Sequence, residues 1–383
     1  MKINIFGSTG IIGSKTLDII KNYFPSIKIN LLCSNTNVRK LISQVNIYSP
    51  KYVYLNDATK INYLKKNIKK NINILNYNEL KSYLINSKSD YTLLAISGYK
   101  SLNYLDPILI NTQSLGLVSK EAVVSAGHLF KDFSKKFKNK IYPLDSEHFS
   151  IFKNINKNFF EISKVKLTAS GGPFLGKNYH SLKNISFSAA SNHPKWKMGY
   201  KNSIDSATLV NKCLELIEAH YLFKIPFSKL DILIHPQALV HSVIEFNNYT
   251  AELNYFYHNM DIPLINFLNL YNKESSFLNF THKKYDFNKN LILKFNTPNS
   301  KLFPILSIFN KIDKKNPREF IKFNLANEFA VNLFKNNKIK YTEILKIIIK
   351  ITSINMEYKL NNIKDIINYH ELLEIKINET INY

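Results

Sequence analysis

The fold of this 383-residue chain is decided close to its start, by the stretch Lys2-Ile3-Asn4-Ile5-Phe6-Gly7-Ser8-Thr9-Gly10-Ile11-Ile12-Gly13. The alternating residues 2–6 predict a buried strand, and apolar residues at helical spacing predict a helix over about residues 14–23. A strand, a glycine loop and a helix make up the dinucleotide-binding arrangement. In it, glycines let the backbone approach a pyrophosphate, and the helix N-terminus faces its charge. The spacing G-x-x-G-x-x-G is a variant of the more common G-x-G-x-x-G, and a tight turn without a ligand is the alternative interpretation.

The end of the next strand indicates which dinucleotide would bind. Residues 28–33 predict this strand, which is followed by Ser34-Asn35-Thr36-Asn37-Val38-Arg39-Lys40. Folds that bind NAD usually carry an acidic residue here, which holds the ribose 2′-hydroxyl. This chain offers hydroxyl, amide and basic groups instead. A 2′-phosphate would be accepted by such groups, so we expect NADPH as the cofactor.

Strands and helices go on alternating through the first 145 residues. Further strands are predicted over Tyr52–Leu55, Ile72–Leu75, Tyr91–Ile96, Ser114–Val118 and Ile141–Leu144. This alternation is typical of a parallel sheet, so the predicted fold class is α/β, with an N-terminal Rossmann-like parallel sheet. The pair Lys120-Glu121 follows a strand, where it could touch the nicotinamide half of the cofactor or form a surface ion pair of little energetic weight.

The chemistry is predicted where the last of these strands ends, at Tyr142-Pro143-Leu144-Asp145-Ser146-Glu147-His148. Asp145 and Glu147 are two residues apart, so in an extended segment both carboxylates point to the same side. Two such carboxylates repel each other unless a cation neutralises them. A hard divalent cation would do so and would need a further oxygen ligand. A polar turn with solvated acids is the alternative interpretation.

The further oxygen ligand is expected from residues 203–218. The residue types at positions 203, 205 and 206 cap helices, and a helical run follows them. Asn211 and Lys212 lie four and three residues before Glu215, so the three side chains share one face of that helix. A polar cluster among apolar neighbours is better explained by a ligand than by solvent. Glu215 is therefore the candidate third carboxylate.

Two loops complete the site that the residues alone predict. Ser170-Gly171-Gly172 follows a strand at residues 165–169 and presents backbone N–H groups and a hydroxyl, as an anion-binding or substrate-binding loop does. Residues 187–200 form an irregular segment that carries His193 and the single tryptophan, Trp196. Such a segment is suited to an active-site lid. A packed surface loop whose tryptophan fills the core is the alternative.

Composition limits the classes of function. Hydrophobic residues make up 45% and charged residues 21% of the chain, and no apolar run is long enough to cross a bilayer, so we expect a globular protein. We expect no targeting leader, because the first residues predict a strand, and the two cysteines form no framework, so we expect a protein of the reducing cytoplasm. The net charge of +24 comes from scattered lysines without a recognition motif. We therefore expect no nucleic-acid or membrane partner, but a phosphorylated small-molecule substrate that the positive charge attracts.

These motifs together resemble the 1-deoxy-D-xylulose 5-phosphate reductoisomerase family over nearly the whole chain. The segments that carry the resemblance are Gly7-Ser8-Thr9-Gly10, Leu144-Asp145-Ser146-Glu147-His148, Ala169-Ser170-Gly171-Gly172-Pro173-Phe174, His193-Pro194-Lys195-Trp196-Lys197-Met198-Gly199, Asp205-Ser206-Ala207-Thr208 with Asn211, Lys212 and Glu215, and Ile234-His235-Pro236-Gln237 with His241-Ser242. Several such segments, in order and at family-like spacing, make the resemblance specific.

The resemblance implies an enzyme that uses NADPH and Mg2+ or Mn2+ to rearrange and reduce 1-deoxy-D-xylulose 5-phosphate to 2-C-methyl-D-erythritol 4-phosphate, in non-mevalonate isoprenoid biosynthesis. It implies that Asp145, Glu147 and Glu215 hold the metal and act with His193 in catalysis. The substrate-binding residues would be Ser146, Glu147, Ser170, His193, Trp196, Ser206, Asn211, Lys212 and Glu215. The cofactor-binding residues would be Gly7, Ser8, Thr9, Gly10, Ile11, Ile12, Thr36, Asn37, Ser119, Lys120, Glu121 and Gly199.

A homodimer with several domains is also implied. The NADPH-binding domain would span residues 1–145 and a central α/β catalytic domain residues 146–268, with a flap at about 187–200. A connection at 269–300 would lead to a small C-terminal helical domain at 301–383. The chain departs from the family pattern at some positions. Ser119 replaces a usual Asn, Tyr200 a usual Arg and Cys213 a usual Gly, and the segment 258–261 replaces a usual Pro-Asp-Met-Arg.

Two other functions stay open at the level of the sequence. Another NADP-dependent dehydrogenase, of the semialdehyde dehydrogenase type, would need a nucleophilic thiol on a loop near a helix N-terminus. Cys33 at a strand end and Cys213 within a helix fit that role poorly. A basic nucleic-acid-binding module would bind DNA or RNA tightly, with a steep dependence on salt.

Overall fold

The computed structural model describes residues 1–69, 71–130, 132–133, 140–155, 161–193, 199–271 and 291–381. It divides into two compact units. The first consists of residues 1–119, 131–145 and 260–283, and the second of residues 120–130, 146–259 and 284–383. Each unit therefore contains segments that are far apart in the sequence.

The first unit is built on a seven-stranded sheet in the order β4-β3-β2-β1-β5-β6-β7. Every pairing in it is parallel. The strands are β1 (Lys2–Phe6), β2 (Lys28–Ser34), β3 (Tyr52–Leu55), β4 (Asn73–Leu75), β5 (Ser89–Leu94), β6 (Thr112–Leu117) and β7 (Lys140–Pro143). Because the order reverses next to β1, the loops after β1 and β5 flank the point where dinucleotides bind in such sheets.

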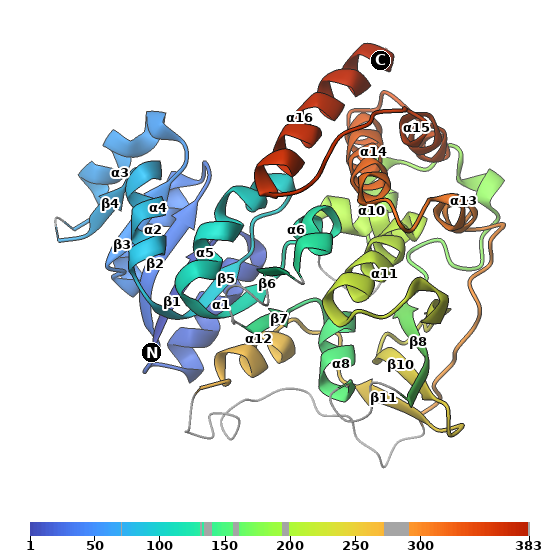
Figure 1. Ribbon diagram of the computed structural model, residues 1–383, viewed down its shortest axis with the longest axis horizontal. Helices are drawn as coiled ribbons and strands as arrows, with labels where there is room; N and C mark the ends of the chain where they lie inside the picture. The colour runs from blue at the N-terminus through green and yellow to red at the C-terminus, as the bar shows by residue number, and fades with distance from the viewer. Residues whose placement is uncertain are drawn as a thin grey trace. The chain divides into compact units, whose positions relative to one another are not determined.

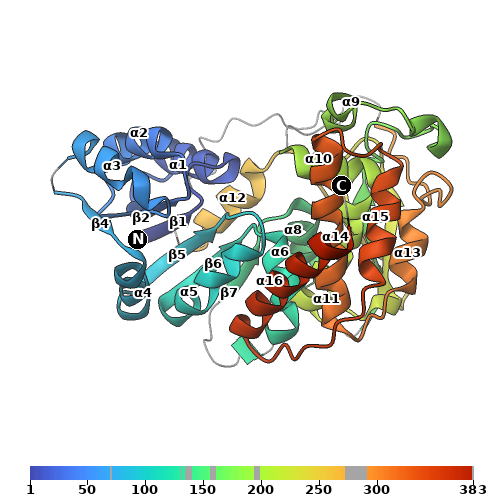
Figure 2. The ribbon, with the colours of Figure 1, turned by 90° about the horizontal axis from the view of Figure 1, so that it is seen from above.

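Helices cover both faces of this sheet, with α1 and α2 on one face and α4 and α5 on the other (Figure 2). The helices are α1 (Ile11–Tyr23), α2 (Val38–Tyr48), α3 (Ile61–Asn67), α4 (Tyr77–Asn86), α5 (Leu105–Asn111) and α12 (Asp261–Leu268), with 3-10 turns η1 (Ala58–Lys60) and η2 (Tyr99–Tyr104). Helix α12 comes from much later in the chain. The hydroxyl of Tyr91 donates a hydrogen bond to the carbonyl of Leu268 at 2.8 Å, and the rings of Tyr91 and Phe267 meet edge to face. These buried contacts fix α12 on the sheet.

The second unit contains a four-stranded mixed sheet in the order β11-β10-β8-β9. Its strands are β8 (Ile162–Ala169), β9 (Leu230–Ile234), β10 (Val240–Phe246) and β11 (Ala251–Tyr255). Its helices are α6 (Lys120–Ala126), α8 (Ser146–Asn154), α9 (Phe187–Ser191), α10 (Tyr200–Thr208), α11 (Val210–Phe223), α13 (Ile305–Lys311), α14 (Pro317–Lys335), α15 (Glu343–Thr352) and α16 (Ile363–Thr380), with 3-10 turns η3 (Gly127–Leu129), η5 (Tyr179–Leu182) and η6 (Phe227–Lys229). The long buried helix α11 packs against α6, α8, α10, α13 and α14 (Figure 1).

The predicted fold class is confirmed: a Rossmann-like parallel sheet is followed by a second α/β part and by C-terminal helices. The predicted strands are all present, with ends shifted by up to three residues. Among the described residues, no helix has the length and apolar character needed to cross a membrane. The finer division at residues 145, 268 and 300 stays a prediction, and part of the predicted connection, residues 272–290, lies outside the described residues.

Three local predictions were wrong. Helix α1 begins at Ile11 and not near Ser14, so its first turn belongs to the glycine loop itself. The stretch after β7 is not extended, because α8 begins at Ser146. The predicted single helix after residue 203 is two helices, with Leu209 between them in the left-handed conformation at φ 67°. The capping-type residues 203, 205 and 206 therefore lie inside α10 and do not cap a helix.

Candidate active site

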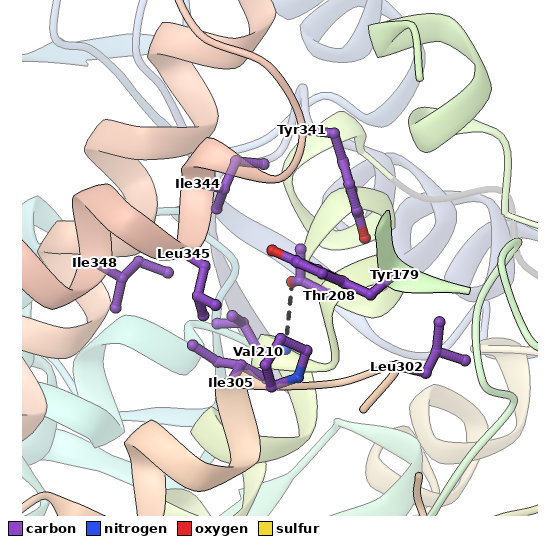
Figure 3. A pocket seen from close by; sticks show the side chains of 10 residues that line it. Tyr179, Thr208, Val210, Leu302, Ile305, Tyr341, Ile344, Leu345 and Ile348 are labelled. Atoms are coloured by element: carbon purple, nitrogen blue, oxygen red, sulfur yellow. Dashed lines mark hydrogen bonds between the residues drawn. The ribbon is translucent and has the colours of Figure 1, made fainter. Parts of the chain in front are cut away.

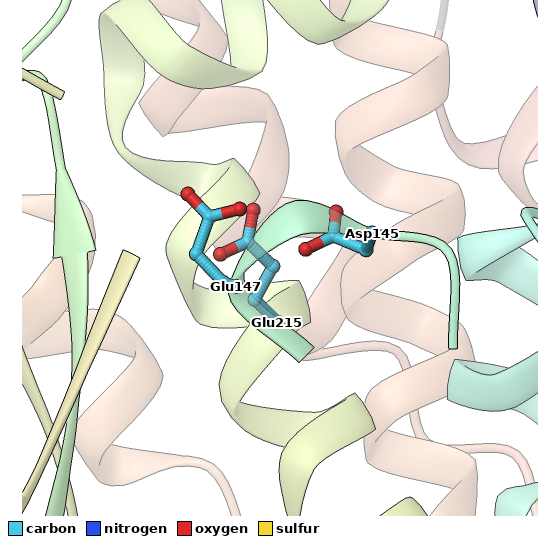
Figure 4. A group of neighbouring side chains, drawn as sticks. All are labelled: Asp145, Glu147 and Glu215. Atoms are coloured by element: carbon cyan, nitrogen blue, oxygen red, sulfur yellow. The ribbon is translucent and has the colours of Figure 1, made fainter. Parts of the chain in front are cut away.

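Three carboxylates converge where β7 ends and α8 begins. Asp145 immediately precedes α8, Glu147 lies in its first turn, and Glu215 comes from the middle of α11. One oxygen from each of the three lies within 4.8 Å of the others (Figure 4). The grouping is the one that the sequence predicts, although its premise of an extended segment was wrong. The start of α8 brings Asp145 and Glu147 to the same side instead.

Two lysines and an asparagine surround these acids. Lys212 donates to Glu147 Oε1 and, at 2.5 Å, to Glu215 Oε2. Lys120 Nζ lies 3.2 Å from Glu215 Oε1 and donates to Asn211 Oδ1 at 2.8 Å. Asn211 in turn donates to Glu215 Oε1. The side chains of Asn211, Lys212 and Glu215 thus share one face of α11, as their spacing predicts, and this face is largely buried.

The acid group fits a hard divalent cation. Mg2+ and Mn2+ take oxygen ligands, and Mg2+ binds them at about 2.0–2.1 Å. Two oxygens on opposite sides of one ion are therefore about 4.2 Å apart, so oxygens within 4.8 Å of one another need only small side-chain movements to share an ion. Ser146 donates to Glu147 Oε2 at 2.6 Å, which steadies that carboxylate.

His148 lies behind the acids and not among them. Its side chain is fully buried, and its Nε2 is 2.9 Å from the backbone carbonyl of Glu215. Its Nδ1 is 3.9 Å from Glu218 Oε2, one helical turn further along α11. The imidazole therefore contacts the backbone that carries Glu215 and offers the acid group no ligand atom. This agrees with a supporting role for His148.

The predicted anion loop lies against the end of α10. Gly171 and Gly172 follow β8 with φ of 87° and 67°, a region that favours glycine. A Cβ on Gly172 would lie 2.9 Å from the carbonyl oxygen of Ser206, so the close approach of the two segments requires glycine. Ser170 Oγ accepts a hydrogen bond from the Gly172 N–H at 3.2 Å and lies 3.1 Å from His193 Nε2. Ser170, Ser206 and His193 thus gather around one loop.

The imidazole of His193 is held neutral by its surroundings. Burial lowers the pKa of His193 from 6.5 to about 4, and the positive charges of Lys212 and His258 act in the same direction. The negative charge of Glu147 opposes them. A neutral imidazole can accept a hydrogen bond on one nitrogen and donate on the other. The rest of the predicted lid, residues 194–198 with Trp196, lies outside the described residues.

In the first unit, the glycine loop has the shape that a pyrophosphate needs. Gly7 has φ 79°, and a Cβ there would lie 2.3 Å from the carbonyl oxygen of Ala95. A Cβ on Gly13 would lie 2.3 Å from the Gly7 carbonyl oxygen, which lets α1 pack on the loop. Ile11 and Ile12 form the first turn of α1, where backbone N–H groups lack intrahelical acceptors. The buried Ser8 Oγ has no hydrogen-bond partner within the described parts of the chain. These features fit an anionic dinucleotide.

The remaining predicted cofactor residues lie at three places. Thr36 and Asn37 follow β2 and are exposed, and the Asn37 side chain caps α2. Ser119 is buried, with its hydroxyl 2.9 Å from that of Ser101. In the second unit, Glu121 Oε1 lies 3.8 Å from Lys201 Nζ, and Gly199 caps α10.

Sequence reasoning missed the part that Lys120 plays in the acid group. Only 13% of its side chain is exposed, so the alternative of a surface ion pair was wrong. Its partner Glu215 is 95 residues away in the sequence, and no local pattern links the two. A pocket elsewhere in the second unit, lined by apolar side chains and by Tyr179, Thr208 and Tyr341, includes none of the predicted site residues (Figure 3). It carries no group suited to the predicted chemistry.

Three models of known families match the chain. The model described as 1-deoxy-D-xylulose 5-phosphate reductoisomerase matches residues 3–127. The model described as the 1-deoxy-D-xylulose 5-phosphate reductoisomerase C-terminal domain matches residues 141–223, and one described as the DXP reductoisomerase C-terminal domain matches residues 257–374. Together these matches cover most of the chain.

Full-length relatives agree with the family models. The 1-deoxy-D-xylulose 5-phosphate reductoisomerase of Sulfurihydrogenibium sp. is 38% identical over 368 residues, which cover 96% of this chain and 94% of the relative. That of Pelagibacter ubique is 37% identical, and the match covers 98% of each chain.

Solved structures agree as well. The structure of 1-deoxy-D-xylulose 5-phosphate reductoisomerase from Zymomonas mobilis in complex with NADPH is 28% identical, with a TM-score of 0.88 over 99% of this chain and 98% of that one. A DOX-P reductoisomerase in complex with NADPH, fosmidomycin and magnesium is 28% identical, with a TM-score of 0.89 at the same coverage. The chain therefore belongs to the 1-deoxy-D-xylulose 5-phosphate reductoisomerase family.

Proposed function

We propose that this protein converts 1-deoxy-D-xylulose 5-phosphate to 2-C-methyl-D-erythritol 4-phosphate, with NADPH as the reductant and Mg2+ or Mn2+ as the metal. The observation that carries the proposal is the convergence of Asp145, Glu147 and Glu215 beside the buried Lys212. Membership of the family supports it over the full length of the chain. The reaction is an isomerisation followed by a hydride transfer, and both steps act on a phosphorylated substrate.

The three carboxylates would hold the metal. When bound, a divalent cation polarises a substrate carbonyl as a Lewis acid and orients the oxygens beside it. Asp145, Glu147 and Glu215 would hold that cation; Glu215 is only 1% exposed, whereas Asp145 and Glu147 are half-buried. Ser146, which donates to Glu147, would bind a substrate oxygen on the same side.

Four polar side chains would bind the phosphate, and two of them, Asn211 and Lys212, also contact the acid group. Ser170 and Ser206 lie on either side of the contact between the anion loop and α10, and Asn211 and Lys212 lie in the first turn of α11. An ammonium group and several neutral donors suit a phosphate dianion. His193, held neutral, would contact the substrate beside Ser170, and Trp196 would cover it from the lid. Binding energy from the phosphate would then favour closure over the reacting carbons.

NADPH would be bound by two sets of residues. Gly7, Ser8, Thr9, Gly10, Ile11 and Ile12 would take the pyrophosphate and Thr36 and Asn37 the adenosine end, while Ser119, Lys120, Glu121 and Gly199 would serve the nicotinamide end. Ser119 has a single hydroxyl where the resemblance implies an asparagine, so it would supply fewer hydrogen-bonding groups than an amide would.

We further propose a cytoplasmic homodimer without a nucleic-acid partner, with the domain division predicted from the sequence. The net charge of +24 fits attraction of two anionic ligands, the substrate and NADPH. The rival dehydrogenase chemistry needs a reactive thiol. Cys33 and Cys213 are both buried, and burial raises the pKa of each thiol well above its ordinary value. Neither cysteine suits a nucleophile, so the site favours the reductoisomerase.

The test is an assay of NADPH oxidation with purified protein. We expect oxidation that requires both 1-deoxy-D-xylulose 5-phosphate and Mg2+ or Mn2+ and that stops in chelator. Treatment with a thiol-alkylating reagent should leave the rate unchanged. Folded protein that shows no turnover under these conditions, or turnover that survives chelator and is lost on alkylation, would contradict the proposal.

A further inference from the structure

A lysine from a different loop lies over the end of β2. Lys60 ends the turn η1, which follows β3, and its ammonium group donates to the backbone carbonyl of Thr36 at 3.1 Å. Thr36 follows β2 and lies 24 residues earlier in the sequence. The sequence pattern at the end of β2 did not include this cation, because nothing local links residue 60 to residue 36.

The two loops are joined by several hydrogen bonds. Strands β2 and β3 are parallel neighbours, with Ser34 paired to Leu55, so both loops leave the same edge of the sheet. The N–H of Asn56 donates to the Ser34 carbonyl and that of Asp57 to the Asn35 carbonyl, each at 3.0 Å. The Asn56 side chain donates to the Asn35 side chain at 2.9 Å. These hydrogen bonds between the two loops therefore hold Lys60 at the end of β2.

This place is next to the glycine loop. The N–H groups of Gly7 and Ser8 both donate to the Cys33 carbonyl at 3.0 Å, and the hydroxyls of Thr9 and Ser34 are 2.9 Å apart. In dinucleotide-binding sheets, the pyrophosphate lies on the first loop and the adenosine ribose at the end of the second strand. The ammonium of Lys60 therefore lies where the ribose 2′-position is expected.

The acid Asp57, which lies beside Lys60, is neutralised by its own loop. Asp57 Oδ2 is 2.8 Å from Lys60 Nζ, and Asp57 Oδ1 accepts hydrogen bonds from the Thr59 N–H and hydroxyl. The hydrogen bond from Lys60, followed by that from Thr59, lowers the pKa of Asp57 below its ordinary value. An acid that accepts these bonds is poorly placed to take the ribose 2′-hydroxyl, as acids do in NAD-binding folds.

We propose that Lys60 binds the 2′-phosphate of NADPH and is the residue that makes this protein select NADPH over NADH. The inference rests on the proposed function, in which NADPH is the cofactor. Thr36 and Asn37 supply a hydroxyl and an amide at the same place, but Lys60 supplies a positive charge from across the two strands. Since 41% of its side chain is exposed, the ammonium can leave the Thr36 carbonyl for a phosphate without breaking buried contacts.

The test measures binding and does not need turnover. Kd values for NADPH, NADH, 2′-AMP and 5′-AMP are determined by calorimetry for the natural protein and for Lys60→Met, Lys60→Arg and Lys51→Met. Lys51→Met is the matched control, because Lys51 is an exposed lysine at the opposite end of β3 and its loss changes the net charge equally. The four ligands separate the 2′-phosphate from the rest of the cofactor.

We expect Lys60→Met to raise the Kd for NADPH and for 2′-AMP roughly tenfold, because one charge-assisted hydrogen bond at a partly exposed site is lost. The Kd values for NADH and 5′-AMP should change less than about twofold. Lys60→Arg should keep most of the preference, and Lys51→Met should leave it unchanged. Equal weakening of NADPH and NADH, or no change in either, would overturn the proposal.

A double variant tests whether Lys60 acts only as the counter-ion of Asp57. If so, Lys60→Met with Asp57→Asn should bind NADPH as the natural protein does, which would overturn a direct contact. If Lys60 binds the phosphate, the double variant should stay as weak as Lys60→Met. Failure of the proposed function would look different, because the natural protein itself would then not bind NADPH in preference to NADH.

Discussion

Replacing Glu215 with Gln is the sharpest test of the acid group. Glu215 is 1% exposed and accepts hydrogen bonds from Lys212 at 2.5 Å, from Lys120 at 3.2 Å and from Asn211. The change keeps the size of the side chain but removes its charge and one acceptor oxygen. Two effects follow, one on the affinity for the metal and one on the stability of the fold. A second buried carboxylate on the same helix allows the two effects to be measured separately.

The metal effect should be the larger. Removing groups that only support a metal ligand typically costs 10–100-fold in affinity, so loss of one of three carboxylates should cost at least about 100-fold. For folding, removing one partner of a buried ion pair costs about 3–5 kcal/mol. The Gln oxygen can still accept one bond, and Lys212 keeps Glu147, so we expect a loss of about 2 kcal/mol.

The matched control is Glu218→Gln. Glu218 is also a buried carboxylate on α11, it lies 3.8 Å from Lys120, and it is not part of the acid group. Mn2+ is titrated into metal-free protein by calorimetry, without substrate or NADPH, and unfolding in urea is measured in parallel. Glu218→Gln should lose stability and keep Mn2+ binding. The reasoning is refuted if Glu215→Gln binds Mn2+ as the natural protein does, or if both variants lose it equally.

Two further predictions concern packing and pH. Gly172→Ala should lose about 1–2 kcal/mol more stability in urea than Gly176→Ala, and should raise KM for the substrate. Both glycines have positive φ, but only at Gly172 would the new Cβ meet another segment, at 2.9 Å from Ser206; equal losses would contradict this. Burial lowers the pKa of His370 from 6.5 to about 3. Below pH 6.5 the unfolded state binds a proton that the buried His370 does not. The stability of the fold is therefore unaffected by this group above pH 6.5 and falls as the pH drops from 6.5 towards 3, by about 2 kcal/mol at pH 5. His370→Gln should flatten this part of the pH–stability curve, whereas the same change at the exposed His180 should leave it as it is.

Local patterns predicted the first sheet well because its strands are buried and its connections are short. The glycine loop could be predicted for a different reason. At Gly7 and Gly13 a Cβ would meet neighbouring backbone, so the residue type itself indicates the backbone constraint. The acid group could be predicted because Asn211, Lys212 and Glu215 share a helical face, which made Glu215 the candidate partner of Asp145 and Glu147, and the resemblance supported the same grouping. Residue spacing predicts which side chains share one face of a helix, but it does not predict which residues pack against that face.

What sequence reasoning missed has a common physical cause. Lys120 reaches Glu215 across 95 residues, and Lys60 reaches Thr36 across 24, each through pairings that only the folded sheet or helix packing brings about. The early start of α8 and of α1 was missed because caps and first turns depend on neighbouring loops as much as on residue type. Such contacts are made by tertiary structure, so no periodicity signals them.

The break between α10 and α11 at Leu209 was also not predicted from the sequence. Leucine rarely adopts positive φ, and holding it there costs on the order of 1–3 kcal/mol unless the surroundings enforce it. Leu209 is 1% exposed, and the N–H groups of Lys212 and Cys213 both approach its carbonyl at 3.2 and 3.4 Å. Helix α10 ends at Thr208 and α11 begins after Leu209, so the backbone of Ser206 at the anion loop and the side chain of Lys212 at the acids come from two neighbouring helices. The residue with positive φ thus lies between the helix end that meets the anion loop and the helix that carries Lys212 and Glu215, so a single left-handed residue sets the path of the chain from one part of the candidate site to the other.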